Sequence, residues 1–363
     1  MRMRLSPTLQ LVNELERARA QGGSAWSLST PTFPAAGPLP QIDDSWIRLT
    51  PPMGLPDLRE AAGTHFFGHW DLPGHTTVIT AGAKAALFAT LRAAMEPGAR
   101  VMVPTPSWPS YIDVCAAARL NAVSFETFLA DDFALDIERL RHEAAACNAQ
   151  AVMLSNPCNP TGRILRAAEI AALSDLCQET GMLLILDQSF SGIVFDADLW
   201  RRSVVPVSDR LVLIDSFSKN HILQGARVGC AALPDWLAET FVTVHQSIVS
   251  AAPTPGQKLA LHALDTGRAM PSLAAQRGLA ADFITRMGWR CHMQAGTFYF
   301  FPQVPDIDAF RARARAQEIF LLTGEAFGAG YGQHFRLCFG KPEAELLQIL
   351  ELLSEPDGPH ARA

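Results

Sequence analysis

A lysine flanked by small polar residues lies within residues 215–229, which read DSFSKNHILQGARVG. The apolar run at 211–214 is typical of a buried strand, so Lys219 follows the end of that strand. A free lysine amine has a pKa of about 10.4 and becomes nucleophilic when burial or a neighbouring cation discharges it. Ser216, Ser218 and Arg227 add hydroxyl donors and a fixed positive charge, which suit a phosphate. The segment predicts a lysine that forms an imine with a phosphorylated aldehyde, although a lone SxSK sequence is more often a solvated loop.

Two further groups that suit a flat, charged ring follow other predicted strands. Asp187 ends the fully apolar run at 182–186, and an acid in such a place must be paired. A ring nitrogen that has to stay protonated is a suitable partner for it. Trp108 lies on a proline-rich loop after the strand at 100–103, where its indole could stack on a heteroaromatic ring or simply fill the core.

A turn that opens a helix offers a seat for phosphate. Gly82, Ala83 and Lys84 follow the strand at 77–80 and precede an alanine-rich helix. The first amides of a helix lack partners within it, and the helix dipole adds positive charge there. The turn matches neither GxGxxG nor GxxxxGK[ST], so the dinucleotide and P-loop patterns are not met.

An asparagine and an arginine complete the candidate set. Asn159 belongs to NPCNPTG at 156–162, where two Asn-Pro steps exclude a helix; the alternative is a rigid surface turn. Arg336 interrupts an apolar strand at 334–340, and its planar fork suits bidentate capture of a carboxylate. A structural arginine in the core or at a sheet edge is the alternative for Arg336.

Together, these stretches resemble the class I and II aminotransferases, which are pyridoxal 5′-phosphate (PLP) enzymes of fold type I. The similar segments are TAGAKAALF, PSWPSY, NPCNPTG, the lysine segment and FRLCFG, and the resemblance extends over nearly the whole chain. It implies an aminotransferase that moves the α-amino group of an amino acid to a 2-oxo acid through an internal aldimine on Lys219.

The resemblance also implies a role for each candidate residue. Trp108 would stack on the pyridine ring, Asn159 would donate to its ring oxygen, and Asp187 would keep its nitrogen protonated. The phosphate would be held by Gly82, Ala83, Lys84, Ser216, Ser218 and Arg227. Arg336 would bind the substrate α-carboxylate, with Asn159 and Thr30, which lies on an extended piece at 26–34, also at the substrate.

Two positions depart from the family pattern. Leu49 and Phe190 stand where the family usually has tyrosines, one reaching across the dimer to the phosphate and one bonding the ring oxygen. Without the hydroxyl at 190, we expect the internal imine to have a raised pKa. The departures leave a second hypothesis open, namely β- or γ-elimination, cyclisation or oxidation of an amino acid in a specialised biosynthetic pathway. A third hypothesis is a PLP-binding regulatory protein without turnover.

The elements that must position these groups alternate between strands and helices. Strands ending near Thr80, Val103, Ser155, Leu186 and Ile214 predict an α/β fold with a mainly parallel central sheet and helices on both faces. Ligands bind at the carboxyl ends of such strands, where each candidate group lies. We expect residues 46–255 to form the large PLP-binding domain. Residues 1–45, as an arm and part of the small domain, and 256–363 complete a smaller α+β domain.

Composition limits the class of protein. The chain has 363 residues, 48% of them hydrophobic, and a net charge of -6, so neither nucleic acid nor a membrane surface is an expected partner. Seven scattered cysteines without a CxxC motif argue against a disulfide framework and a thiolate metal site, which favours the cytoplasm. No metal is expected. The resemblance implies a homodimer with shared active sites.

Overall fold

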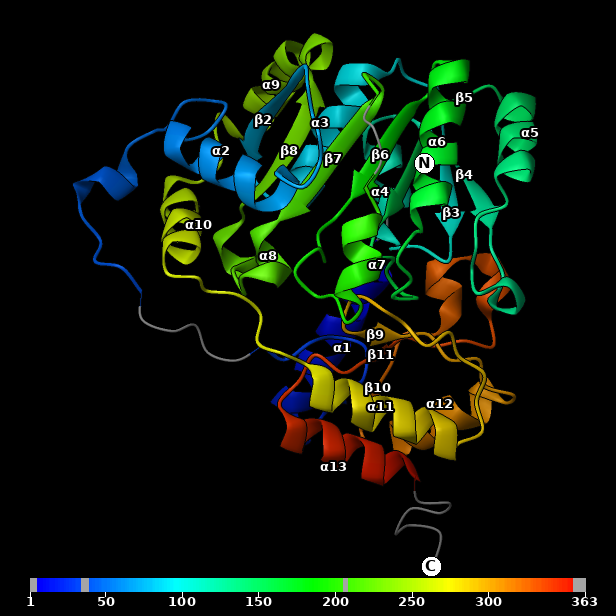
Figure 1. Cartoon of the computed structure of the whole chain (residues 1–363). Coiled ribbons are helices and arrows are strands. Elements are labelled where there is room, and N and C mark those ends of the chain that lie inside the picture. The colour runs from blue at the N-terminus through cyan, green and yellow to red at the C-terminus, as the bar shows by residue number, and fades with distance from the viewer. Residues whose placement is uncertain (1–4, 34–38, 205–207, 355–363) are drawn as a thin grey trace, which may run out of the picture.

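The computed structural model of the chain describes residues 5–33, 39–204 and 208–354. Figure 1 shows a sheet wrapped by helices, with a smaller group of helices and short strands packed at one end of it. Among the described residues, no helix is both long and apolar enough to cross a membrane. The extended piece predicted at 26–34 forms only the two-residue strand β1 (Trp26–Ser27), and Pro34 lies outside the described residues.

The central sheet has seven strands in the order β2-β8-β7-β6-β5-β3-β4. The strands are β2 (His75–Thr80), β3 (Arg100–Thr105), β4 (Asn121–Glu126), β5 (Ala149–Ser155), β6 (Leu183–Asp187), β7 (Leu211–Ser216) and β8 (Gly229–Pro234). Only β8 runs antiparallel to its neighbours, β2 and β7, while the other pairs are parallel. The carboxyl ends of β2, β3, β5, β6 and β7 therefore meet at one edge, which confirms the predicted mainly parallel α/β fold.

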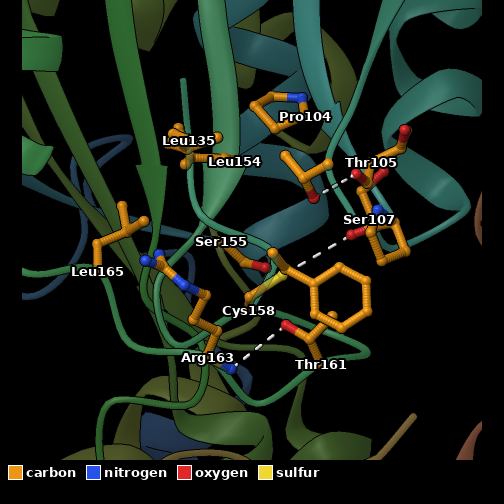
Figure 2. Close-up of a pocket in the computed structure, with 13 residues that line it drawn as sticks. Pro104, Thr105, Ser107, Leu135, Leu154, Ser155, Cys158, Thr161, Arg163 and Leu165 are labelled. Atoms are coloured by element: carbon orange, nitrogen blue, oxygen red, sulfur yellow. Dashed lines mark hydrogen bonds between the residues drawn. The ribbon is translucent and has the colours of Figure 1, made fainter. Parts of the chain in front are cut away.

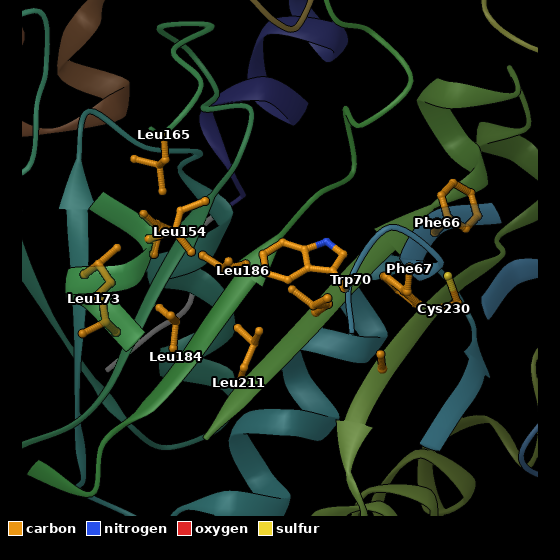
Figure 3. Packing of buried hydrophobic residues seen from close by; sticks show 14 of the residues in the cluster. Phe66, Phe67, Trp70, Leu154, Leu165, Leu173, Leu184, Leu186, Leu211 and Cys230 are labelled. Atoms are coloured by element: carbon orange, nitrogen blue, oxygen red, sulfur yellow. The ribbon is translucent and has the colours of Figure 1, made fainter. Parts of the chain in front are cut away.

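Helices cover both faces of the sheet because its strands are apolar on both sides. In β6, Leu184 and Leu186 face a cluster that includes α2, α5, α6 and α10, whereas Leu183 and Ile185 face α3, α4 and α9. Figure 3 shows part of the first cluster, with Trp70 packed beside the leucines of the strands. These helices are α2 (Pro56–Ala62), α3 (Ala83–Ala94), α4 (Ser110–Ala117), α5 (Ile137–Cys147), α6 (Ala167–Thr180), α9 (Asp235–Val249) and α10 (Thr254–Asp265).

Local sequence signals start and stop helices that cover the sheet. Asp136 caps α5 by accepting from the Arg139 amide, and Gly181 ends α6 in the left-handed conformation. Helix α2 continues directly into a π-helical turn at Gly63–Phe67. Along the chain, the shorter helix α7 (Ala197–Arg202) lies between β6 and β7, and α8 (Phe217–Asn220) lies between β7 and β8. Helix α8 contains Lys219.

The smaller part joins both ends of the described chain. Strand β1 pairs in parallel with β10, and β9 pairs antiparallel with β11. Buried phenylalanines, among them Phe283, Phe298 and Phe335, form its core. Its elements are α1 (Pro7–Ala20), α11 (Ala274–Arg286), β9 (Tyr299–Phe300), α12 (Ile307–Ala316), β10 (Ile319–Phe320), β11 (Leu337–Cys338) and α13 (Glu343–Ser354). This arrangement gives the expected smaller α+β part.

Helix α10 packs with the large unit. Its residues Ala260 and Ala263 are buried in the cluster over the sheet, together with Leu58 of α2. The division expected at residues 255 and 256 would cut α10 near its start, so we propose that the large domain extends through Asp265.

Candidate active site

One cavity at the carboxyl edge of the sheet collects the candidate residues. It has a volume of about 430 Å³, within the range typical of small-molecule sites. Eleven of the twelve predicted residues line it: Thr30, Ala83, Lys84, Trp108, Asn159, Asp187, Ser216, Ser218, Lys219, Arg227 and Arg336. The twelfth, Gly82, lies against the guanidinium group of Arg227. The cavity is also lined by Thr8 and Leu9 of α1, so both parts of the chain enclose it.

Lys219 is placed by a short helix that starts at the end of β7. Ser216 caps this helix through its hydroxyl, which accepts a hydrogen bond from the Ser218 amide at 3.1 Å. Burial lowers the pKa of Lys219 to about 8, and the positive charges of Arg336 and Arg227 act in the same direction, against an opposing effect of Cys338. The amine is therefore substantially neutral at mildly alkaline pH and can act as a nucleophile or a base.

Asp187 ends β6 as a buried carboxylate that accepts three hydrogen bonds. Ser189 donates its amide at 3.0 Å and its hydroxyl at 2.6 Å to Oδ1, and the Tyr111 hydroxyl donates to Oδ2 at 2.9 Å. Burial raises the pKa of Asp187, whereas these donors lower it by favouring the charged form. Its charged carboxylate can therefore form an ion pair with a cationic group of a ligand.

The turn before α3 meets Arg227. Gly82 has a φ of 85°, and a Cβ at this position would lie 2.7 Å from Nη2 of Arg227, so only glycine fits. The amides of Ala83 and Lys84 begin the helix and lack partners within it. Lys84 Nζ lies 3.1 Å from the Ser110 hydroxyl, and burial lowers the pKa of this lysine. Backbone donors and two cations thus converge on one corner of the cavity.

Arg336 is held from both parts of the chain. Its Nη1 donates to Oδ1 of Asn159 at 3.1 Å, and its Nη2 donates to the backbone oxygen of Ser29 at 2.7 Å. Its buried Nε has no hydrogen-bond partner within the described chain. Because Oδ1 of Asn159 accepts from Arg336, the amide nitrogen of Asn159 is the atom available to donate elsewhere. Thr30, next to Ser29, donates its amide and its hydroxyl to the Ser27 hydroxyl, which fixes the chain at 27–30 beside the cavity.

The segment that carries Asn159 is fastened by hydrogen bonds and an ion pair. The backbone amide of Asn159 donates to the Ser155 hydroxyl at 3.0 Å, and the backbone amide of Cys158 donates to the backbone oxygen of Arg163 at 2.8 Å. A small adjoining cavity of about 30 Å³ is lined by Cys158, Thr161 and Arg163, as Figure 2 shows. Arg163 is paired in turn with Glu169 at 2.8 Å. These contacts hold Asn159 rigidly at the end of β5.

Two pairs of aromatic side chains line the large cavity. Trp108 packs edge-on against Tyr111 with ring centroids 5.5 Å apart, and Lys84 Nζ lies 4.9 Å from the centre of the indole. Phe190 packs edge-on against Tyr299 at 5.8 Å and lines the cavity without a hydroxyl. Leu49 does not line it and is 78% exposed.

The residues present fit a phosphorylated pyridine aldehyde. Lysine, buried carboxylate and phosphate-type donors lie around one cavity, and the buried Nε of Arg336 still lacks a partner in the described part of the chain. The described residues contain no cluster of His, Cys, Asp or Glu that could hold a metal ion.

Sequence reasoning missed several residues that support the site. Tyr111 and Ser189 bond Asp187, Ser29 bonds Arg336, and His245 accepts a hydrogen bond from the Ala81 amide. The PSWPSY segment contained a signal for Tyr111, since this tyrosine follows Trp108 by three residues and its amide bonds the Trp108 oxygen at 3.0 Å at the start of α4. The His245 contact joins residues 164 positions apart and has no local signal.

Comparisons with known proteins agree with this geometry. The family described as aminotransferase class I and II matches residues 36–353. An aspartate aminotransferase of Thermotoga maritima is 27% identical over 370 residues, covering 97% of this chain and 96% of that protein. An aspartate/prephenate aminotransferase of Thermus thermophilus is 28% identical over 318 residues, covering 84% of this chain and 82% of that protein.

Solved structures share the fold. A crystal structure of the Thermotoga maritima aspartate aminotransferase superposes with a TM-score of 0.83 at 23% identity, covering 96% of each chain. The Thermus thermophilus aspartate aminotransferase with maleate gives a TM-score of 0.82 at 24% identity, covering 97% of each chain.

Proposed function

The chain belongs to the aminotransferase class I and II family, and from this premise we propose that the cavity around Lys219 uses PLP to move an α-amino group from an amino acid to a 2-oxo acid. The observation that carries the proposal is the meeting of Lys219, Asp187, Arg227 and Arg336 in one cavity. A nucleophile, an acid and a cation in this arrangement suit a cofactor with an aldehyde, a ring cation and a phosphate. The second cation suits the carboxylate of a substrate.

Each part of the cofactor has matching groups. Lys219 would hold the aldehyde, Asp187 the ring nitrogen and Asn159 the ring oxygen, while Trp108 would cover one face of the ring. The phosphate would take the corner formed by Ser216, Ser218, Arg227 and the turn at 82–84. The convergence of unpaired helix amides with the Arg227 guanidinium supports this placement.

Arg336 would orient the substrate, and Lys219 would transfer its Cα proton. Two N–H groups of Arg336 already bond Asn159 and Ser29, so its guanidinium is fixed before a carboxylate arrives. The cofactor supplies an electron-accepting ring when bound. The lowered pKa of Lys219 lets its neutral amine take the proton from the substrate Cα and return it.

Covalent trapping tests the assignment of Lys219. Borohydride reduction of the PLP-loaded enzyme, followed by peptide mass mapping, should place the cofactor on the peptide that contains Lys219. The matched control is Lys219→Arg, which keeps the positive charge and should give no trapped cofactor. A stable adduct on Lys84 in the unchanged enzyme would refute the assignment.

We further propose that the enzyme is a cytoplasmic homodimer. Ile42, Ile47 and Leu49 are 77%, 86% and 78% exposed in the single chain, and several exposed apolar side chains within one short segment are typical of an interface. Free cysteines, such as buried Cys230 and Cys338, fit a reducing compartment. Light scattering should give twice the mass of the chain, 39.4 kDa, and a monomer would contradict this proposal.

A further inference from the structure

A fully buried histidine touches the backbone just before the turn at 82–84. His245 lies in α9, and its Nε2 accepts a hydrogen bond from the Ala81 amide at 3.1 Å. Ala81 directly follows β2 and precedes Gly82. The contact therefore ties α9, on one face of the sheet, to the start of the proposed phosphate site.

This hydrogen bond requires a neutral imidazole. Nε2 accepts, so the ring proton must be on Nδ1, and protonation of Nε2 would set two donors against each other. Burial lowers the pKa of His245, which agrees with the neutral form. The ring stacks on Phe241 with centroids 6.3 Å and planes 6° apart, which fixes its direction.

The other hydrogen bonds made by the backbone of this turn are local ones. The Gly82 amide bonds the Thr80 oxygen at 2.8 Å, and the Gly82 oxygen accepts from the Ala85 amide at 3.1 Å. Both bonds lie within the turn and the first turn of α3. The bond to His245 instead comes from a separate helix, so it restrains the turn relative to the rest of the large unit.

We propose that His245 is a positioning residue that holds the turn at 82–84 in the conformation that binds the cofactor phosphate. The inference rests on the proposed function, because it assumes that this turn binds phosphate. His245 acts through the Ala81 amide and does not touch the cofactor. The structure thus gives α9, which contributes no residue to the cavity, an indirect part in cofactor binding.

Three substitutions separate the hydrogen bond from packing. In His245→Gln, Oε1 lies three bonds from Cβ, as Nε2 does in histidine, so the acceptor is kept. In His245→Asn the acceptor lies one bond nearer the backbone and falls short of Ala81. His245→Phe keeps an aromatic ring for the stack on Phe241 but has no acceptor.

Binding of PLP and of pyridoxal, which lacks the phosphate, to the unloaded enzyme is measured by cofactor absorbance. Losing the acceptor for the part-buried Ala81 amide should weaken PLP binding roughly tenfold in His245→Phe and His245→Asn, whereas His245→Gln should stay within about twofold. Pyridoxal affinity should be unchanged in all three variants. Equal weakening for both ligands, or no weakening of PLP binding, would overturn the inference.

A control variant separates this result from a failure of the proposed site. Ser218→Ala removes a hydroxyl assigned to the phosphate, keeps the cap made by Ser216, and should weaken PLP binding but not pyridoxal binding. If Ser218→Ala and Arg227→Gln both leave the preference for PLP over pyridoxal intact, the proposed phosphate site is wrong. If they reduce it and the His245 variants do not, the role of His245 alone is wrong.

Discussion

Removal of the Tyr111 hydroxyl should impair catalysis without disturbing the fold. Tyr111 is fully buried, and its hydroxyl donates to Oδ2 of Asp187 at 2.9 Å. Tyr111→Phe deletes that donor and keeps the ring that packs against Trp108 at 5.5 Å. The variant therefore isolates one of the three hydrogen bonds that stabilise the charged form of Asp187.

The size of the effect follows from the charge on the acceptor. A hydrogen bond to a charged group contributes about 1.5–3 kcal/mol, and about 1.4 kcal/mol corresponds to a factor of ten. Without this bond, the pKa of Asp187 should rise, and its carboxylate should hold a ring cation less well. We expect the rate of the first half-reaction, amino acid to 2-oxo acid, to fall roughly 10- to 100-fold.

Single-turnover kinetics at saturating amino acid measure this rate directly. Thermal unfolding of the same variant checks that the fold is intact. Ser189→Ala is a second test of the same idea, because it removes a different donor, the hydroxyl at 2.6 Å, from the same carboxylate and should also slow the half-reaction. A normal half-reaction rate in both variants would refute the view that these donors maintain the charge of Asp187.

Three other changes test further parts of the site. Uptake of PLP by the unloaded enzyme should accelerate with pH and reach half its maximum near pH 8, since the pKa of Lys219 is about 8; a rate still rising steeply above pH 10 would contradict the lowered pKa. Phe190→Tyr should lower the midpoint of the spectral pH titration of the loaded enzyme, because the added hydroxyl can donate to the ring oxygen, and identical midpoints would sink this expectation. Arg336→Gln should raise KM for the amino donor roughly 10- to 100-fold through loss of a charged hydrogen-bond donor while PLP is still taken up; unchanged KM would remove Arg336 from substrate binding.

The sequence predicted the position of a candidate residue well where that residue follows a buried strand. Asp187 and Asn159 could be placed because β6 and β5 are apolar runs that end in polar residues, and parallel strands bring such ends together. Lys219 was found in the same way after β7. Membership of the family and the α/β fold were predicted from the same segments and are confirmed.

Contacts between distant segments could not be predicted in this way. The bond from Ala81 to His245 and the bond from Arg336 to Ser29 depend on how whole elements pack, and no local pattern encodes that. Strand lengths in the smaller part were also misjudged. Residues 334–340, predicted as one strand, are buried throughout, but only Leu337 and Cys338 form strand β11, so Arg336 lies just outside it.

The most direct test of the account is a single-turnover reaction of the PLP-loaded enzyme with a panel of amino acids that includes aspartate, the substrate named for several relatives. The cofactor spectrum is followed and the products are identified by mass. The account predicts conversion of the cofactor to its pyridoxamine form with one equivalent of the matching 2-oxo acid. Recovery of the starting spectrum together with ammonia, or with a cyclic or unsaturated product, would contradict amino-group transfer.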